Sequence, residues 1–454
     1  MSPPKAPSPA SLTNTMAPST LRPTRVRWQM VALVTLITAL TYLDRLNLSI
    51  AGKYIQDEFG FSTQTMGWLL SAFVLGYALF QVPGGWAGDR YGPRGVLTSV
   101  IVWWSVFTAG TALVPRLPFR AWLGLAWSFA LIRFLVGVGE AAAFPNINKT
   151  VACWMAANQR GIGNSVFGAG VGVGGTITPV FIAAMMQRWG WRASFYVCAA
   201  LGLAVAMLWR FHATNRPEEH PRVNAAELAL IRAQDPAETG GSQAATAPRQ
   251  RAPWGRMLSS GSVWGLILSY FCIAYPAYIF YTWFFIYLVR VRGLSLTQGG
   301  WGSSAPFLVI TVLAPLGGWF SDRAVAKFGK RRGRQGAVLL GALVSAILLR
   351  IGSHTAHNTL AILLLAAAAG FNLFATTSWW ATCTDLTPRF TGSLSGLMNM
   401  CGNLGGWVSP ILTAYIATHF GWSQALDFAA VMTLLAAALW LGVNAGSSLE
   451  GELP

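Results

Sequence analysis

Two side chains of opposite charge, Asp44 and Arg45, lie within a long apolar segment near the start of the chain. The segment runs from Trp28 to about Ile50 and is long enough to cross a lipid bilayer. Facing lipid at that depth, either charge would cost several kcal/mol. We therefore expect the pair to face a water-filled or protein-lined interior as a functional site. The alternative is a structural ion pair at a helix end, reaching toward the membrane surface.

A second charged pair, Arg133 and Glu140, lies in a later apolar segment. The two residues are seven positions apart, so they share one face of a helix about two turns apart. Gly137 and Gly139 between them make the helix thin enough for a close neighbour. We expect all four charged side chains to point into one cavity. A purely structural alternative is a permanent salt bridge between Glu140 and Arg133.

These residue types suit the transport of an organic anion with protons. A guanidinium such as that of Arg45 is a planar fork that matches a carboxylate and keeps its charge. A buried carboxylate, here Asp44 or Glu140, can take up and release a proton as its surroundings change. The predicted spans contain no histidine apart from His212 at one end, so proton coupling falls to the acids.

The composition identifies the broad class of protein. The chain has 454 residues, of which 54% are hydrophobic and only 10% are charged, as in a polytopic membrane protein. The net charge of +17 would suggest nucleic acid in a soluble chain, but the Lys and Arg residues fall on alternate loops. We therefore expect no nucleic-acid partner.

Catalytic and metal-binding patterns are not found. The five cysteines occur singly in apolar context, without the paired spacing of a disulfide or metal site. The spans contain no nucleophile with a base and no set of metal ligands. We expect no cofactor, no metal and no enzymatic activity.

Twelve apolar windows of about 20 residues predict an all-α membrane protein with two six-helix bundles. The predicted spans are 28–50, 64–86, 95–115, 121–143, 163–186, 193–212, 262–288, 300–321, 336–352, 358–380, 393–417 and 424–445. The corresponding regions are a disordered cytoplasmic tail (1–27), an N-terminal bundle (28–212), a cytoplasmic linker (213–261), a C-terminal bundle (262–446) and a second cytoplasmic tail (447–454).

Positive charge predicts the orientation. With the N-terminus inside, the cytoplasmic segments hold 22 of the 32 Lys and Arg residues when Arg210, at the cytoplasmic end of the sixth span, is counted with them. Cytoplasmic loops carry such an excess in membrane proteins, so both termini are expected to be cytoplasmic. The basic cluster at 323–334 is the strongest single anchor, although contact with anionic lipid is an alternative role for it.

The two halves resemble each other at a nearly constant offset. Residues 85–90 (GWAGDR) recur as 318–323 (GWFSDR), 233 positions later. Residues 174–179 (GGTITP) correspond to 405–410 (GGWVSP), 231 positions later. Parallel repeats of this kind place a binding site at their interface near mid-membrane, reached alternately from each side.

The loop after the second span carries Gly85, Asp89, Arg90 and Arg94, and its repeat carries Asp322 and Arg323. Small residues allow close helix contact, while the charges can pair across the cytoplasmic seam in one conformation only. These six residues are our predicted gating set; the alternative is that the arginines only enforce topology. The loop resembles the signature of the major facilitator superfamily, with Pro93 where a basic residue is usual.

Within that superfamily, the chain resembles the anion:cation symporter family, which includes bacterial sugar-acid carriers. The resemblance rests on 42–45 (YLDR), on Gly76 followed by Tyr77, and on the spacing from Arg133 to Glu140. It implies that Arg45 holds a substrate carboxylate and that Tyr77 hydrogen-bonds it. It also implies that Asp44 and Glu140 are the protonatable pair and that Arg133 tunes Glu140. Further substrate contacts are expected at Tyr42, Tyr281, Ser378, Trp379 and Asn399.

We therefore expect a secondary active transporter, with the major facilitator fold, that imports a small organic carboxylate by proton symport. A sugar acid is the favoured substrate, and the protein is expected as a monomer in the bacterial cytoplasmic membrane. Two intramembrane acids raise the hypothesis of two protons per cycle. Alternatives are a proton-coupled exporter of drugs or other organic ions, and a membrane sensor on the same scaffold that transports nothing.

Overall fold

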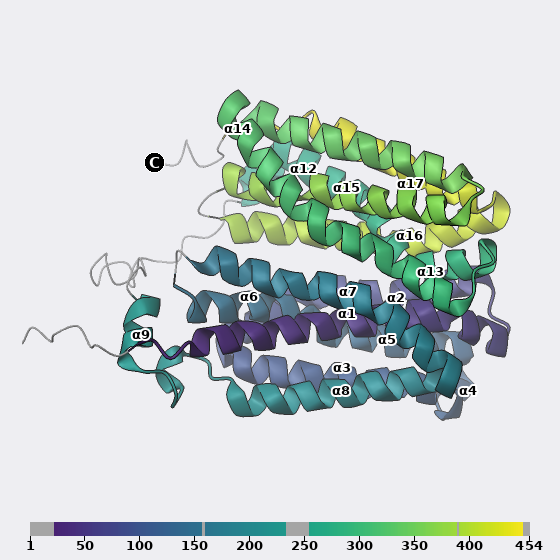
Figure 1. Cartoon of the computed structure of the whole chain (residues 1–454), viewed down its shortest axis with the longest axis horizontal. Helices are drawn as coiled ribbons and strands as arrows, with labels where there is room; N and C mark the ends of the chain where they lie inside the picture. Colours follow the sequence, from purple (N-terminus) through teal and green to yellow (C-terminus); the bar gives the residue numbers. More distant parts are fainter. Residues whose placement is uncertain (1–21, 157–158, 233–253, 388–389, 448–454) are drawn as a thin grey trace, which may run out of the picture.

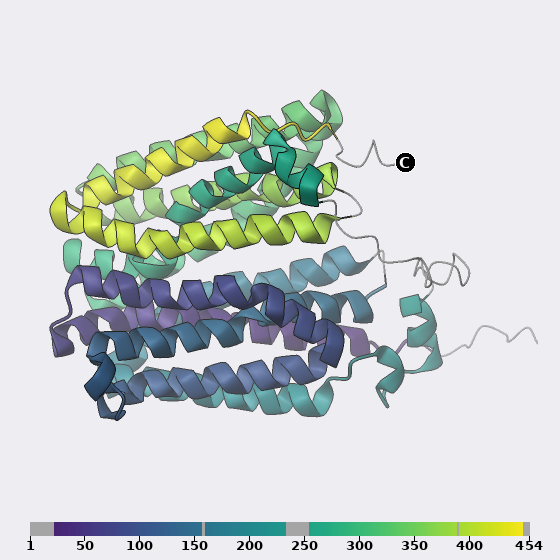
Figure 2. The ribbon, with the colours of Figure 1, turned by 180° about the vertical axis from the view of Figure 1, so that it is seen from behind.

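The computed structural model describes residues 22–156, 159–232, 254–387 and 390–447. These residues form helices arranged as two bundles that lie side by side (Figure 1). Figure 2 shows the same two bundles from behind, with α16 and α17 in front. Residues 1–21 of the predicted N-terminal tail, 233–253 of the predicted linker and 448–454 of the predicted C-terminal tail lie outside the described residues.

The first bundle is formed by α1 to α8. Its helices are α1 (Val26–Phe59), α2 (Thr63–Tyr91), α3 (Pro93–Leu113), η1 (Val114–Arg116), α4 (Arg120–Leu123), α5 (Leu125–Ala141), α6 (Ala143–Trp154), α7 (Arg160–Trp189) and α8 (Trp191–His212). The predicted fourth span began too early. Gly124 has a φ of 76°, which separates α4 from α5, and the span begins at Leu125 and extends through α6.

The second bundle is formed by α12 to α17. Its helices are α12 (Gly261–Thr282), α13 (Phe284–Ile286), η4 (Tyr287–Val291), α14 (Leu296–His354), α15 (Asn358–Leu386), α16 (Thr391–His419) and α17 (Trp422–Trp440). The linker contributes η3 (Pro217–Glu219), α9 (Ala225–Arg232) and α11 (Trp254–Ser259). We call the two ends of the bundles the α9 end and the α4 end, after the short helices that lie there (Figure 1).

Ten helices among the described residues are long and apolar enough to cross a membrane. The twelve predicted spans are all helical in the structure, and two reasons explain the lower number. The long helix α14 contains the predicted eighth and ninth spans, which meet at a kink where Gly329 has a φ of 79°. The predicted eleventh span is α16, which is not among the ten and which contains many small and polar residues.

Two glycines bring α2 and α5 into backbone contact. A Cβ added at Gly137 of α5 would lie 2.1 Å from the carbonyl oxygen of Phe73, and one at Gly76 of α2 would lie 2.3 Å from that of Phe134. No other residue type fits at either position without moving a helix. This contact fixes Tyr77, the next residue of α2, beside the charged residues of α5.

The bundles are in contact at the α4 end. Ser49 of α1 donates a hydrogen bond of 2.5 Å to the carbonyl oxygen of Thr282 at the end of α12. Arg290 of η4 forms an ion pair with Asp57 of α1. Two further hydrogen bonds join α7 to α14: Gln187 Nε2 lies 3.1 Å from Thr297 Oγ1, and Ser304 Oγ lies 2.6 Å from the carbonyl oxygen of Thr176. This end is therefore closed.

The described part of the linker that contains α9 is attached to the first bundle. The carboxylate of Glu227 in α9 is buried and accepts hydrogen bonds from the backbone N–H groups of Val26 and Arg27, at 2.9 and 3.1 Å. It also accepts one from the Thr24 hydroxyl and pairs with the Arg27 guanidinium. These partners belong to the N-terminus of α1, where backbone N–H groups are free and favour an anion.

Burial by itself raises the pKa of the Glu227 carboxyl, but the hydrogen bonds and the charge of Arg27 outweigh it. The pKa is therefore held below its usual range. A charged Glu227 stabilises the folded protein, since it fastens the linker to the first transmembrane helix.

Candidate functional site

A cavity of about 560 Å³ lies between the two bundles. Its walls come from α1, α2 and α6 on one side and from α12, α15 and α16 on the other. It reaches Asn148, near the end of α6, and Gly392, at the start of α16, so it extends to the α9 end. Since the bundles are in contact at the α4 end, the cavity is reached from one side.

Arg45 supplies the positive charge of this cavity. Its Nε donates a hydrogen bond of 2.8 Å to Oε2 of Glu140, whose side chain is fully buried. One amino group of the guanidinium, Nη2, is buried without a hydrogen-bond partner among the described residues. The cation is held in place, and part of its donor capacity is not used by the described part of the protein.

Aromatic rings surround this guanidinium. Its central carbon lies 4.3 Å from the centre of the Tyr77 ring and 5.5 Å from that of Tyr42. Phe73 and Phe144 lie at 5.4 and 5.7 Å. Rings at these distances attract a cation through their π-electrons and exclude water from it, which strengthens its attraction for an anion.

The expectation that four charged side chains line one cavity is wrong. Of the four, only Arg45 lines the large cavity. Arg133 lines a separate space of about 30 Å³ that also touches Arg45, and neither Asp44 nor Glu140 lines either space. The physical reason is helix geometry. Adjacent residues of a helix point about 100° apart, so Arg45 faces the cavity while Asp44 faces the inside of its own bundle.

Asp44 nevertheless lies in one charged cluster with the others. It is 1% exposed, and both of its carboxylate oxygens are without a hydrogen-bond partner among the described residues. Its electrostatic neighbours are Arg133 and Glu140 on α5, with Thr108 of α3 and Cys198 of α8 also beside it. Among the described residues, Glu140 forms its salt bridge with Arg45 and not with Arg133, so the structural alternative of a pair between Glu140 and Arg133 is not found.

The predicted contacts of the first bundle and of α12 lie at the cavity. Tyr42, Tyr77 and Tyr281 all line it. The rings of Tyr42 and Tyr281 meet edge to face with their centres 6.1 Å apart, so an aromatic contact joins the two bundles beside Arg45. Tyr281 also stacks on Phe307 of α14 at 5.7 Å.

Two predicted contacts on α15 do not reach the cavity. Ser378 is fully buried, with its hydroxyl 3.0 Å from that of Ser321. Trp379 donates to the Ser269 hydroxyl at 2.9 Å and packs on Trp440, with ring centres 4.3 Å apart. Thr376 and Trp380, one turn apart, line the cavity instead. The sequence segment was the right one, but the face of the helix was assigned incorrectly.

Asn399 of α16 lines the cavity, and its amide nitrogen donates a hydrogen bond of 2.8 Å to Gln81 of α2, joining the two bundles. Other polar or aromatic lining residues that were not predicted as site residues are Tyr270, Tyr278, Asn372 and Asn403. The signal was present in the sequence, because asparagines are rare in apolar spans and mark an interior face.

In the first bundle, the predicted gating residues make contacts within their own bundle. Asp89 pairs with Lys149 of α6 at 2.8 Å, and Arg94 donates to the carbonyl oxygen of Arg210 at 2.8 Å. Arg90 lies over the rings of Trp86 and Tyr91, and Gly85 faces Pro145.

The repeat of this motif in the second bundle behaves in the same way. Asp322 pairs with Arg334 at 2.7 Å, and Arg323 lies over Trp319. Arg334 also pairs with Asp385. Pairing of these charges across the seam between the bundles is not seen at the open α9 end.

Sequence comparison places this fold in a known family. The family model of the Major Facilitator Superfamily matches residues 34–410. The chain is 32% identical over 424 residues to a probable chloroplastic anion transporter of Oryza sativa subsp. japonica, covering 93% of this chain and 77% of that protein. It is 31% identical over 411 residues to a probable galactarate/D-glucarate transporter of Bacillus subtilis, covering 88% and 87%. Against a probable sulfoacetate transporter of Cupriavidus necator, identity is 30% over 426 residues, covering 94% of each.

Solved structures agree on the fold. A bacterial homolog of the human lysosomal transporter Spinster, in an inward-facing and unoccupied conformation, superposes with a TM-score of 0.74 at 18% identity, covering 92% of this chain and 96% of that one. A D-xylose-proton symporter superposes with a TM-score of 0.71 at 17% identity, covering 93% and 99%. The chain therefore belongs to the Major Facilitator Superfamily and, within it, to the anion:cation symporter-type transporters.

Proposed function

We propose that this protein imports a small organic carboxylate, with a sugar acid favoured, together with protons across the bacterial cytoplasmic membrane. The observation that carries this proposal is the Arg45 guanidinium, which faces a cavity between two repeats and has an unpaired amino group. A planar cation in an aromatic, water-poor setting binds a carboxylate more strongly than it does in water.

In this proposal the substrate carboxylate binds to Arg45, and the phenol groups of Tyr42, Tyr77 and Tyr281 surround it. All four side chains line the cavity, and both repeats contribute to the group. A ligand held by both repeats favours the closed arrangement of the bundles, because its contacts are complete only when the bundles approach each other.

Proton coupling follows from the pairing of Arg45 with Glu140. In the structure, Glu140 accepts a hydrogen bond of 2.8 Å from Nε of the guanidinium, so this donor is not free for a substrate. A proton taken up by the Glu140 carboxylate removes its charge and weakens this pair. Nε and Nη2 are then both free to donate to one substrate carboxylate in a bidentate manner. Loss of the proton restores the pair and expels the substrate, so proton and substrate move together.

Asp44 is proposed as the second proton carrier, with Arg133 setting the proton affinity of both acids from its place between them. An anion that enters a cell with a negative interior is opposed by about 2.3 kcal/mol per charge per 100 mV. One proton per monoanion makes the cycle electroneutral, whereas two protons let the membrane potential drive uptake.

Alternating access is supported by the one-sided cavity. We place the α9 end in the cytoplasm, on the charge distribution of the loops, so the structure corresponds to an inward-open state. In the outward-open state the contacts at the α4 end, such as Arg290 with Asp57, separate. The gating residues at the α9 end, among them Asp89 and Asp322, then come close to the opposite bundle.

Transport by the purified protein in proteoliposomes tests this function. We expect accumulation of a labelled sugar acid when the exterior is acidic, and loss of accumulation when a protonophore removes the gradient. Arg120→Ala is a suitable control, since Arg120 is exposed in α4, at the end of the protein away from the cavity mouth. No gradient-driven uptake from a broad panel of carboxylates would contradict the proposal.

Export of cationic drugs, the alternative within transport, has less support. Among the described lining residues of the cavity there is no carboxylate, and the charged group that faces the ligand is a cation. A cationic ligand would be repelled by Arg45 unless it carried its own anion. Absence of competition between organic cations and the labelled carboxylate is the expected result in the same vesicles.

A further inference from the structure

The two sides of the cavity differ in charge in a way that constrains its ligand. We propose that the site accepts an acid with one carboxylate and rejects the acid of the same carbon chain that has a carboxylate at both ends. This inference rests on the proposed function and specifies its substrate class. Because relatives are named for galactarate and D-glucarate, which carry two carboxylates, the inference separates this chain from them.

Arg45 is the one charged side chain among the described residues that line the cavity, and its charge is positive. Arg133, the other arginine of the charged cluster, lies in the same bundle and lines the small adjacent space. Among the described lining residues, positive charge is therefore available at the first bundle alone, and a single carboxylate is sufficient to neutralise the group that faces the ligand.

On the opposite wall, formed by α12, α15 and α16, two of the hydroxyl donors that line the cavity are already engaged. The Tyr278 hydroxyl donates to Oδ1 of Asn403 at 2.7 Å. The Thr376 hydroxyl donates to the carbonyl oxygen of Asn372 at 2.8 Å. Neither hydroxyl proton is free for a ligand without loss of an existing hydrogen bond.

The amide groups of this wall keep both donor and acceptor capacity. One amide hydrogen each of Asn372, Asn399 and Asn403 is used, at 3.3, 2.8 and 2.9 Å. Each NH₂ group has a second hydrogen, and an amide oxygen accepts two bonds. A substrate hydroxyl, which donates and accepts, matches such groups. A carboxylate accepts hydrogen bonds but donates none. It can therefore use the remaining amide hydrogens, but the amide oxygens gain no partner from it.

Closure of the cavity would remove water from a second carboxylate. The described residues at its mouth are uncharged, among them Val82, Pro145, Gly396 and Met400. While the cavity is open, a second carboxylate can stay hydrated. When the bundles close over the ligand, the carboxylate loses water without gaining a cation, and an unpaired buried charge is strongly unfavourable. We expect discrimination of about 100-fold or more against the doubly charged acid.

Matched acids provide the experiment. Gluconate and glucarate differ only in whether the last carbon is a CH₂OH group or a carboxylate, and galactonate and galactarate form a second such pair. Benzoate and terephthalate, whose second carboxylate is at the opposite end of the ring, test the same charge difference on an aromatic frame. Binding to the purified full-length protein is measured by isothermal titration, and uptake is measured in proteoliposomes. We expect the one-carboxylate member of at least one pair to bind and be transported, and its partner to be about 100-fold weaker in both assays.

Each remaining outcome counts against a defined part of the argument. Equal affinity and equal transport within a pair overturn the charge rule but leave the proposed function intact. Binding of a two-carboxylate acid in preference to its partner has the same meaning. If no member of any pair binds or is transported while another carboxylate of the broad panel is taken up, the inference fails and the proposed function stands. If no carboxylate of the panel is taken up, the proposed function fails, and the inference fails with it.

A change of charge on the opposite wall is the complementary test. Thr376 lines the cavity, and its hydroxyl bonds to its own helix, so replacing it orphans no donor from another element. Thr376→Lys is expected to raise the affinity for the two-carboxylate acid at least tenfold. Thr376→Met, which has a similar length and no charge, is the matched control and is expected to give no gain. A gain with Met equal to that with Lys would contradict the charge explanation.

Discussion

The two bundles have similar backbones and different chemistry. The first bundle buries Asp44, Arg133 and Glu140 within its membrane-spanning helices, and it presents Arg45 to the cavity. At the repeat offsets of 231 to 233, Arg133 corresponds to 364–366 (LLA) and Glu140 to 371–373 (FNL), all uncharged. The second bundle instead supplies asparagines, a threonine and aromatic rings to the cavity.

This difference shows that the symmetry needed for alternating access is a symmetry of the backbone. Two similar bundles can rock about a central site regardless of which one carries the charges. The charges that we propose to respond to protons lie close together in one bundle. The other bundle is free to determine the shape and polarity of the ligand.

Removal of Arg45 from the first bundle should reduce substrate uptake more than any other change. Arg45→Ala leaves the substrate carboxylate and Glu140 without their cation, so we expect uptake to fall about 100-fold or more. Arg45→Lys keeps the charge but loses the bidentate geometry, and it should restore only part of the activity. Initial uptake rates in proteoliposomes, with protein amount checked by size-exclusion chromatography, measure both. Wild-type uptake by Arg45→Ala would remove the substrate role.

Neutralisation of Glu140 should separate exchange from accumulation. Glu140→Gln resembles the protonated acid, so Arg45 remains free to bind substrate but no proton is released. We expect exchange of labelled for unlabelled substrate to persist and accumulation driven by a pH gradient to disappear. Accumulation equal to that of the wild type would assign the proton to another group, with Asp44 the first to test.

A change in the second bundle should have a smaller effect, on the KM for the substrate and not on the proton dependence. Asn403→Ala removes the acceptor of the Tyr278 hydroxyl and one amide from the cavity wall. Loss of a neutral hydrogen bond costs about 1 kcal/mol, which corresponds to a change of about fivefold. We expect the KM for the substrate to rise by about that factor while the dependence on the pH gradient is unchanged. An altered proton dependence would show that coupling is not confined to the first bundle.

The smallest effect on transport is expected at Glu227, which lies outside both the cavity and the spans. Because its pKa in the folded protein is depressed, its stabilisation is present above the unfolded pKa, near 4.3, and is lost as pH falls through the folded value. Glu227→Gln should lower the melting temperature at pH 7 without changing KM. The difference from the wild type should shrink as the pH falls below about 4.

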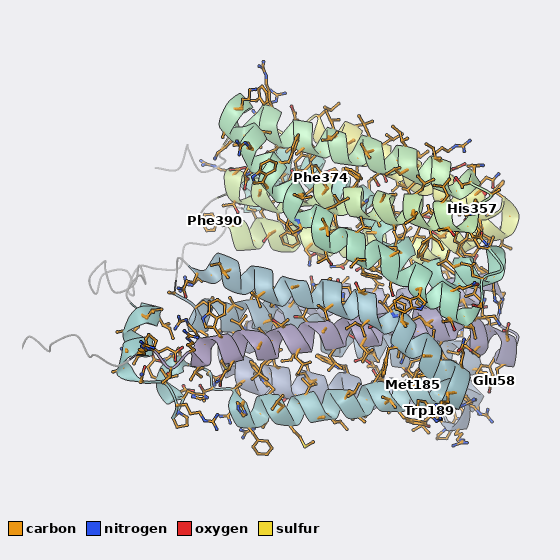
Figure 3. The ribbon with its side chains drawn as sticks, viewed as in Figure 1. Glu58, Met185, Trp189, His357, Phe374 and Phe390 are labelled. Atoms are coloured by element: carbon orange, nitrogen blue, oxygen red, sulfur yellow. The ribbon has the colours of Figure 1, made fainter. Side chains whose placement is uncertain are left out.

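A matched control for the Glu227 experiment is Glu58→Gln. Glu58 accepts from Trp191 and Arg192 at the α4 end (Figure 3), and its side chain is 38% exposed. An exposed ion pair contributes little to stability, so the melting temperature should change less than with Glu227→Gln. The reverse order would mean that the linker contact is weaker than its geometry indicates.

The sequence by itself determined the class of protein, the repeat and the charged residues of interest. Apolar windows of fixed length are enough to place transmembrane helices, because a bilayer leaves the backbone few alternatives. The cost of an intramembrane charge likewise marks Asp44, Arg45, Arg133 and Glu140 without any structure. Helix lengths were less secure, since Gly124 and Gly329 produce breaks and kinks that an apolar window does not register.

Only the tertiary structure decided which side chains face the ligand. Every residue of a span is compatible with a helix, but the face that meets the cavity depends on how the helices rotate and cross in the bundle. This is why Thr376 and Trp380 line the cavity while Ser378 and Trp379 do not. The pairing of Arg45 with Glu140 is decided in the same way: the residues are 95 positions apart in the chain, and the close packing of α2 and α5 brings the charged face of α5 to α1.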